Sequence, residues 1–241
     1  MCNPDKTEIT LFSSRFSSRQ AMESFSVENF PIQLSDSVCN LGVIFDKHLS
    51  FSQHINNICR KATLAMKSVS RIRKYLSADN LKCLVNTMVI SHLDYCNGLL
   101  YGLPDTEISK LQRVQNAAAR LISGTRRCEH ITPILKVLHW LPVRSRLTYN
   151  ILITTYKIIH GLAPSYMSSL LKVRQSSRSL RSSSRSLLSI PSTKTKSYGQ
   201  RAFSFSAPHL WNGLPESLKC SCSLESFKSS LKTYLFKQYY D

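Results

Sequence analysis

The side chains of this 241-residue chain that could do chemistry are above all its lysines and arginines. Thirty-two basic residues stand against 14 acidic ones, which gives a formal net charge of +18 and an isoelectric point near 9.8. The excess is concentrated in the second half, where the stretch from Arg126 to Arg201 holds 14 basic residues and a single acid, Glu129. Positive side chains concentrated in one region repel one another unless anions neutralise them, so we expect a partner that offers phosphates.

The candidate nucleic-acid contacts are the basic residues of the first long amphipathic segment and of the basic second half. They are Arg60, Lys61, Lys67, Arg71, Arg73, Lys74, Arg126, Arg127, Arg144, Arg146, Arg174, Arg178, Arg181 and Arg185. The alternative interpretation is that these side chains only solvate the surface of a bundle. A third possibility is a basic face that binds acidic proteins.

Cysteine and histidine give no clear metal or nucleophile site. The eight cysteines never form Cys-x-x-Cys, and the nearest approach to a zinc pattern is Cys128 and His130 with His139 further on, plus Cys220 and Cys222. Paired zinc ligands are usually separated by two to four residues, so reduced thiols explain these positions better. No Gly-x-Ser-x-Gly elbow or adjacent carboxylate pair accompanies the histidines. We therefore predict no catalytic residues, no metal and no small-molecule substrate.

The hydrophobic share of 42% suffices for a core in a chain of this length. No apolar run reaches the roughly 18 residues of a membrane span, and the N-terminus has no apolar signal-peptide core. We expect an intracellular protein without a membrane partner, and the compartment and oligomeric state stay open.

Two kinds of hydrophobic pattern divide the chain. Residues 9–12, 30–34 and 39–46 have the apolar, β-branched character of strands, and we expect the last two to pair around the turn at residues 35–37. Apolar residues then recur at helical spacing over residues 55–76, 81–93 and 108–122. Ser77 and Gly124 have the positions of an N-cap and a C-cap, so three helices joined by short turns are expected.

The second half predicts further helices and a short β segment. Prolines after residues 132 and 141 mark helix starts, and a long helix ends near residue 160. Residues 174–186 alternate Arg and Ser, bury little, and should be the most mobile stretch of the free chain. Residues 187–191 and 202–205 are expected to pair as strands before an aromatic loop at 208–215, and Ser223 caps a final helix.

Several short stretches, in order along almost the whole chain, resemble the reverse transcriptases of non-LTR retrotransposons, particularly jockey-like ones. They are Asn-Pro-Asp-Lys-Thr-Glu (3–8), Leu-Gly-Val-Ile-Phe-Asp (41–46), Leu-Ser-Phe (49–51), His-Ile (54–55), His-Leu-Asp-Tyr-Cys (92–96), Leu-Gln-x-Val-Gln-Asn-x-Ala-Ala-Arg-Leu-Ile (111–122), Leu-His-Trp-Leu-Pro-Val (138–143), Arg-Ala-Phe (201–203), Trp-Asn-x-Leu-Pro (211–215), Phe-Lys (227–228) and Leu-Lys-Thr-Tyr-Leu-Phe (231–236).

The resemblance implies a truncated enzyme. Family polymerases hold two metal ions with a palm Asp-Asp pair and a further Asp, and no Asp-Asp pair occurs in this sequence. The match at residues 3–8 falls just downstream of that motif in the family, so the chain is expected to start after the catalytic centre. It would lack polymerase activity, need no cofactor, and retain at most sequence-independent binding of RNA or RNA/DNA duplex.

The resemblance also suggests what each part of the chain does. The expected parts are a palm remnant with a hairpin like the primer grip (1–49), a three-helix thumb-like bundle (50–124), further helices (125–173), a basic Ser/Arg-rich segment with short strands and an aromatic loop (174–222), and a C-terminal helix (223–241). The primer-grip-like residues would be Leu41, Gly42 and Val43. A hairpin that merely covers the bundle is the alternative, and a non-functional transposon-derived product is the alternative for the whole chain. Trp140 and Trp211 could stack bases, but core packing is favoured because both lie among Leu and Pro.

Overall fold

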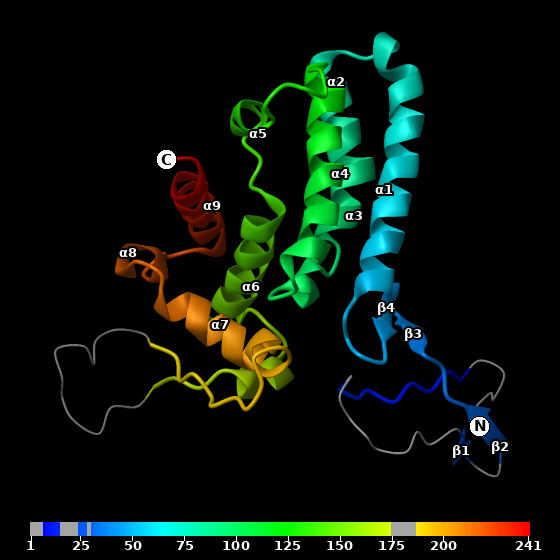
Figure 1. The fold of residues 1–241 in the computed structure, drawn as a ribbon. Helices are drawn as coiled ribbons and strands as arrows, with labels where there is room; N and C mark the ends of the chain where they lie inside the picture. Colours follow the sequence, from blue (N-terminus) through cyan, green and yellow to red (C-terminus); the bar gives the residue numbers. More distant parts are fainter. Residues whose placement is uncertain (1–6, 15–23, 28–29, 175–186) are drawn as a thin grey trace.

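The computed structural model describes residues 7–14, 24–27, 30–174 and 187–241. The fold is mainly helical, with small antiparallel hairpins near its N-terminus, which confirms the predicted class (Figure 1). None of the helices formed by these residues combines the length and the apolar character that crossing a membrane requires.

The N-terminal part forms two separate hairpins. The strands are β1 (Ser24–Val27), β2 (Phe30–Gln33), β3 (Ser37–Asn40) and β4 (Val43–Asp46), and β1 pairs with β2 while β3 pairs with β4.

This pairing differs from the predicted one. Residues 39–46 do not pair with residues 30–34 but fold back on themselves, because Leu41 and Gly42 take positive φ angles of 48° and 80°. Two successive positive φ angles make the tight two-residue turn that antiparallel strands favour. The strand predicted at residues 9–12 is also wrong, since Ile9 makes only an isolated parallel bridge to Leu34.

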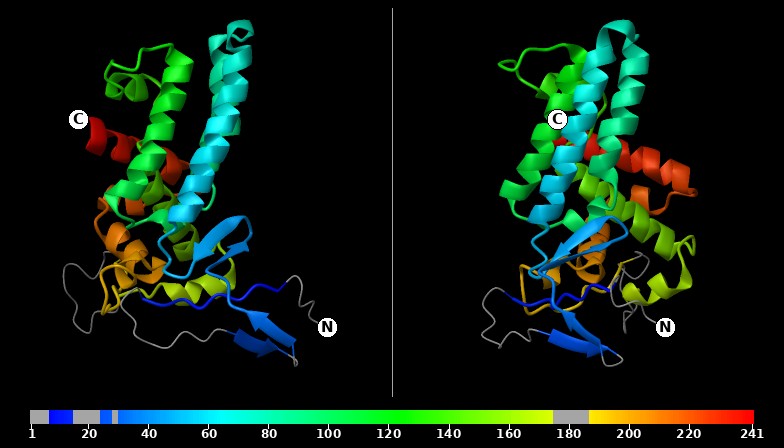
Figure 2. Two further views of the ribbon diagram at one scale, coloured as in Figure 1. Left: turned by 45° about the vertical axis from the view of Figure 1, so that its right-hand side comes forward. Right: turned by 90° about the vertical axis from the view of Figure 1, so that its right-hand side faces the viewer.

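Three helical segments run up, down and up to form a bundle (Figures 1 and 2). They are α1 (Ser52–Ile72), the descending series α2 (Ala78–Val85), η3 (a π turn, Asn86–Ile90) and α3 (Ser91–Asp94), and α4 (Asp105–Ser123). The short 3₁₀ elements η2 (Arg73–Tyr75) and η4 (Asn97–Leu100) connect them. Both predicted caps are present, since the Ser77 hydroxyl accepts a hydrogen bond from the Asn80 N–H and Gly124 ends α4 at φ 76°.

The descending series departs from the predicted apolar stripe at its π turn. The helical spacing over residues 81–93, counted from Leu81, Leu84 and Val85, predicts a core position for Met88 and none for Ile90, yet Met88 is 41% exposed and Ile90 is buried. A π turn holds more residues than an α turn and therefore shifts the buried stripe along the sequence. Ile72, predicted as core, is 45% exposed because it lies at the end of α1, where the chain turns toward α2.

The regular elements of the second half, among its described residues, are all helices. It contains α5 (Thr132–Val137), α6 (Val143–Ile159), η5 (Ser165–Leu170), η6 (Gly199–Arg201), α7 (Phe203–Asn212), α8 (Glu216–Lys219) and α9 (Leu224–Tyr240). The predicted strand at residues 202–205 is wrong, as is the predicted loop over residues 208–212, because residues 203–212 form α7, which packs on α6; residues 213–215 are a turn. Leu188 makes only an isolated bridge, to Val173. Ser223 caps α9 as predicted.

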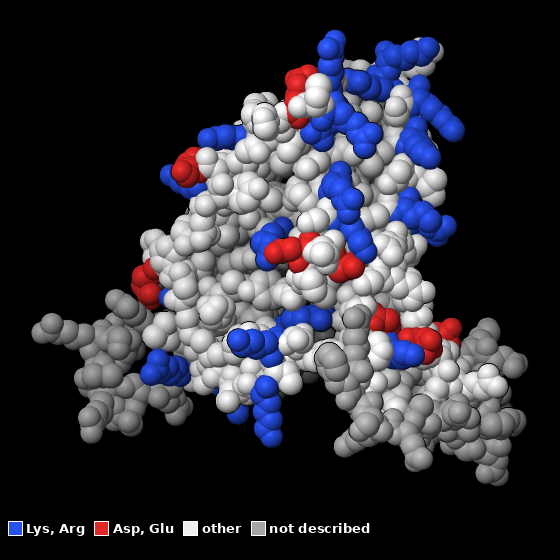
Figure 3. Space-filling model, in the orientation of Figure 1, with Lys and Arg blue, Asp and Glu red and all other residues white. Residues whose placement is uncertain are grey.

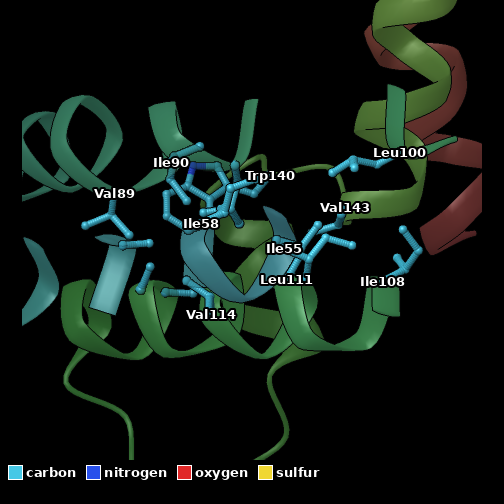
Figure 4. Packing of buried hydrophobic residues seen from close by; sticks show 14 of the residues in the cluster. Ile55, Ile58, Val89, Ile90, Leu100, Ile108, Leu111, Val114, Trp140 and Val143 are labelled. Atoms are coloured by element: carbon cyan, nitrogen blue, oxygen red, sulfur yellow. The ribbon is translucent and has the colours of Figure 1, made fainter. Parts of the chain in front are cut away.

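Buried side chains form two clusters. The first fills the three-segment bundle and extends to Trp140, Val143 and Leu147; the second joins α6, α7 and α9 around Trp211 and Phe227. Figure 4 shows side chains of α1, α4 and the descending series converging in the first cluster. Trp140 and Trp211 are 5% and 1% exposed, so core packing, not base stacking, is their role.

Candidate nucleic-acid interface

The solvent-facing side of α1 is a row of cations. Arg60, Lys67 and Arg71 are seven and four residues apart, which places them on one face of the helix. That face is opposite Ile58, Ala62 and Val69, the buried side. Lys61 is also exposed, on the flank of the row. We call Arg60, Lys61, Lys67 and Arg71 the basic face.

No carboxylate compensates this row. The sequence contains no Asp or Glu between Asp46 and Asp79, a stretch that includes all of α1. Within the described residues, no ion pair involves any member of the basic face. The Arg60 guanidinium donates a long hydrogen bond, 3.4 Å, to the Asn57 side-chain oxygen, which is a neutral partner. The charges of α1 therefore remain available to an external anion.

The end of α1 meets the end of α4. The Arg73 guanidinium lies so close to Gly124 that a Cβ there would be 2.7 Å from its Nη2 atom. Arg126 and Arg127 follow in the next loop and are exposed, as are Arg73 and Lys74. Figure 3 shows lysine and arginine side chains gathered at this end of the molecule and along α1. We call Arg73, Lys74, Arg126 and Arg127 the basic tip.

One acidic residue, Glu129, lies close to the basic tip in the sequence. Glu129 accepts a hydrogen bond at its carboxylate from the Arg126 backbone N–H, at 3.2 Å, and its carbonyl accepts one from the Arg120 guanidinium, at 3.1 Å. These contacts shape the loop after α4. The side chains of Arg126 and Arg127 form no ion pair with any described residue.

Arg144 and Arg146 lie elsewhere, at the start of α6, and the side chain of each forms an ion pair. Arg144 forms an ion pair with Asp105, and the Arg146 Nε donates to an Asp94 oxygen at 2.8 Å. The side chain of Arg146 is only 20% exposed. These two arginines thus join α6 to the bundle and are not part of the basic face or the basic tip.

The remaining predicted contacts are not brought to this surface. Arg174 is exposed, and its backbone N–H donates to the Leu187 carbonyl at 2.9 Å. Arg178, Arg181 and Arg185 lie outside the described residues, as does most of the segment predicted to be mobile.

The primer-grip-like residues form the β3–β4 turn. Leu41 is 83% exposed at its tip, and Val43 is 2% exposed in the first core cluster. The Tyr95 hydroxyl donates to the Leu41 carbonyl at 2.7 Å and ties the turn to the end of α3. The turn is thus a rigid projection that presents one apolar side chain.

A second group of cations lines a groove at the opposite end of α4, and of this group only Arg144 was predicted as a contact from the sequence. Its volume is about 340 Å³, and its walls include Tyr101, Arg144, Lys196, Arg201 and His209. Arg144 is paired with Asp105, and an Arg201 Nη atom donates to the Leu49 carbonyl at 3.0 Å. Burial lowers the pKa of Arg201 from its usual value. Most of the positive charge in this groove is therefore used to hold the fold together.

Polar residues of the recognisable motifs also serve the fold. The Gln115 side chain is fully buried and donates to the Leu141 carbonyl at 2.8 Å, while Gln112 accepts from the Val143 N–H at 2.9 Å. The Asn212 side chain accepts a hydrogen bond from the Leu188 N–H at 2.9 Å and donates one to the Leu188 carbonyl at 2.8 Å. Sequence reasoning noted these motifs but not these contacts, because their partners are distant in the chain.

Two titratable groups beneath the basic face have shifted pKa values. Burial, and then the charge of Lys61, lower the pKa of His54, whose Nδ1 accepts a hydrogen bond from the Ile44 N–H at 3.4 Å. Burial acts to raise the pKa of Asp46, but hydrogen bonds from Ser50 and Phe51 outweigh it and lower the pKa. Both groups hold the β3–β4 hairpin against the start of α1 and have no reactive partner.

No group of three His, Cys, Asp or Glu side chains that could hold a metal ion occurs among the residues of known position. The chemistry that this surface supports is electrostatic binding of an extended anion. Comparison with family models, with curated proteins and with solved structures finds no match to this chain.

Proposed function

We propose that this chain binds RNA or RNA/DNA duplex without sequence preference, through phosphate contacts of the basic face and the basic tip. The observation that carries the proposal is the row Arg60, Lys67 and Arg71, which is exposed to solvent and has no acidic partner among the described residues. Basic side chains on a rigid helix contact phosphates, and such contacts carry no sequence information.

The dimensions of the surface suit a short stretch of duplex. Eleven residues separate Arg60 from Arg71, so their Cα atoms lie about 16 Å apart along the helix axis. A B-form DNA duplex rises about 3.4 Å per base pair, so the row would match about five base pairs of such a duplex, and slightly more of the more compact A form of RNA and RNA/DNA. The basic tip extends the same charged surface beyond the end of α1. About five phosphate contacts are a reasonable count for the whole surface.

The resemblance to non-LTR reverse transcriptases supports the same proposal. In that interpretation the bundle corresponds to a thumb, and the chain is a fragment of the polymerase that keeps duplex binding without catalysis. The basic face lies on the element that this interpretation assigns to duplex contact.

A triple variant that removes three positive charges tests the proposal. Arg71→Gln, Arg73→Gln and Lys74→Gln together should weaken binding of every duplex alike, because they remove phosphate contacts and leave the core unchanged. The matched control is Lys172→Gln, Lys232→Gln and Lys237→Gln, which removes the same charge from exposed positions away from α1.

The two variants separate a binding surface from net charge. If the basic face and tip bind the phosphates, only the first variant loses affinity, and its salt slope flattens by up to about 2.7. If the first variant binds every duplex as tightly as the native chain, Arg71, Arg73 and Lys74 only solvate the bundle, and if both variants lose affinity equally, the effect is one of net charge; either result would refute the proposal.

A further inference from the structure

Tyr75 projects from the turn between α1 and α2, next to the basic tip. Its side chain is in η2, directly after Arg73 and Lys74, and the residue is 76% exposed. The following residue, Leu76, is partly buried and packs against the first core cluster. Leu76 therefore anchors this turn, and Tyr75 is not needed as an apolar contact for the core.

The backbone that carries Tyr75 is fixed on both sides. The Leu76 N–H donates to the Arg73 carbonyl at 3.2 Å, and the Ser77 hydroxyl caps α2 by accepting from the Asn80 N–H at 3.3 Å. A ring on an ordered turn loses little further conformational freedom when a ligand packs on it, since only the side chain must be immobilised. The turn thus presents a preorganised aromatic surface.

The charges around the ring favour a nucleic acid as its ligand. The Lys74 Nζ lies over one face of the Tyr75 ring, 4.9 Å from its centre, and Arg71 and Arg73 are within four residues. An acid, Asp79, lies on the other side in sequence, in the first turn of α2. A ring bordered by cations that can hold phosphates suits the uncharged face of a base, because every base has a π surface that stacks on an aromatic side chain.

Only some bases can reach such a ring. Inside a duplex both faces of each base are covered by its neighbours, apart from the outer faces of the two terminal pairs, whereas a base of a single-stranded overhang can turn a free face to the ring. We propose that Tyr75 stacks on an unpaired base while the basic tip holds the adjoining phosphates, so that the tip favours overhangs and junctions over blunt-ended duplex. This inference rests on the proposed function, because the phosphate contacts bring the base to the ring.

A matched tyrosine makes the test specific. Tyr166 is 75% exposed and also lies in a 3₁₀ element, η5, away from the basic tip. The probes are one RNA/DNA duplex with blunt ends and the same duplex with a three-nucleotide single-stranded overhang. The variants are Tyr75→Ala, Tyr75→Phe and Tyr166→Ala, all in the full chain.

The expected result is a loss confined to one variant and one probe. The native chain should bind the overhang probe more tightly, and Tyr75→Ala should lose about 5- to 150-fold on it, the range for one base–aromatic stack. Tyr75→Phe and Tyr166→Ala should retain the native affinity, and the salt slope of Tyr75→Ala should stay native because no phosphate contact is removed.

The failures of the two proposals are distinguishable. If Tyr75→Ala binds the overhang probe as the native chain does, while the Arg71, Arg73 and Lys74 variant is weakened, the stacking inference is wrong and the binding function stands. If the native chain binds neither probe, both proposals are wrong. An equal loss in Tyr166→Ala would also overturn the inference, since the effect would not be specific to the tip.

Discussion

An Arg201 Nη atom donates a hydrogen bond to the Leu49 carbonyl at 3.0 Å, across 152 residues of chain. The same guanidinium lies 5.7 Å from the centre of the Phe51 ring. The Arg201 side chain, from the second half of the chain, thereby contacts the junction between the β3–β4 hairpin and α1. The element that carries the basic face is held at its base by this contact.

Arg201→Lys should therefore destabilise the chain although the charge is kept. An ammonium cannot reproduce the planar fork that reaches the carbonyl while it lies over a ring. We expect a loss of about 1.5–3 kcal/mol in the free energy of unfolding, typical of hydrogen bonds to charged groups. Urea unfolding measures it, with Lys196→Arg, in the same groove, as the control. An unchanged unfolding midpoint would show that the Arg201 contact contributes nothing to stability.

Gln115→Ala should be at least as disruptive. The side chain is fully buried, donates to the Leu141 carbonyl, and accepts from Gln112 at 2.9 Å. Its removal leaves a buried carbonyl without its donor, which costs about 1–3 kcal/mol, and opens a cavity as well. Gln53→Ala, on the exposed start of α1, is the control that should leave the melting temperature nearly unchanged.

Ile58→Asp should unfold the bundle, whereas Leu84→Asp should be milder than the apolar pattern alone predicts. Ile58 is 6% exposed in the first core, and Leu84 is only partly buried. A buried carboxylate without a partner costs several kcal/mol, which is comparable to the stability of a small domain. Circular dichroism on heating compares the two; a native melting curve for Ile58→Asp would contradict the core assignment.

Stability should fall in two steps as the pH is lowered. The pKa of His54 is below 6.5 in the folded chain, so the unfolded chain takes up this proton first and stability decreases as the pH drops below about 6.5. The pKa of Asp46 is below 3.8, so a second loss begins below that value. His54→Gln should remove the first step in urea titrations at a series of pH values. If the variant keeps that step, another group causes it.

The helices could be predicted from the sequence because their signals are local. Apolar spacing, Ser77, Ser223 and Gly124 determine helix faces and ends within a few residues. The basic face was likewise readable, because spacings of seven and four place cations on one side of a helix.

The parts that could not be predicted depend on distant contacts. Phe203 and Phe205 alternate with serines like a strand, yet Ala207 and Trp211 are buried in a helix that packs on α6. The partner of β3 depended on a two-residue turn at Leu41 and Gly42 that competes with a turn at residues 35–37. The meeting of Arg73 with Gly124 brings together two sequence segments that no local pattern connects.

The measurement that tests the central claim most directly is the salt dependence of duplex binding by the native chain. If about five phosphates are contacted, the logarithm of the affinity should fall with the logarithm of salt concentration at a slope of about −4 to −5. Raising salt from 50 to 200 mM should then weaken binding by roughly three hundred- to a thousandfold, equally for two RNA/DNA duplexes of unrelated sequence. A slope near zero, or a strong preference for one sequence, would contradict a phosphate-binding surface on α1.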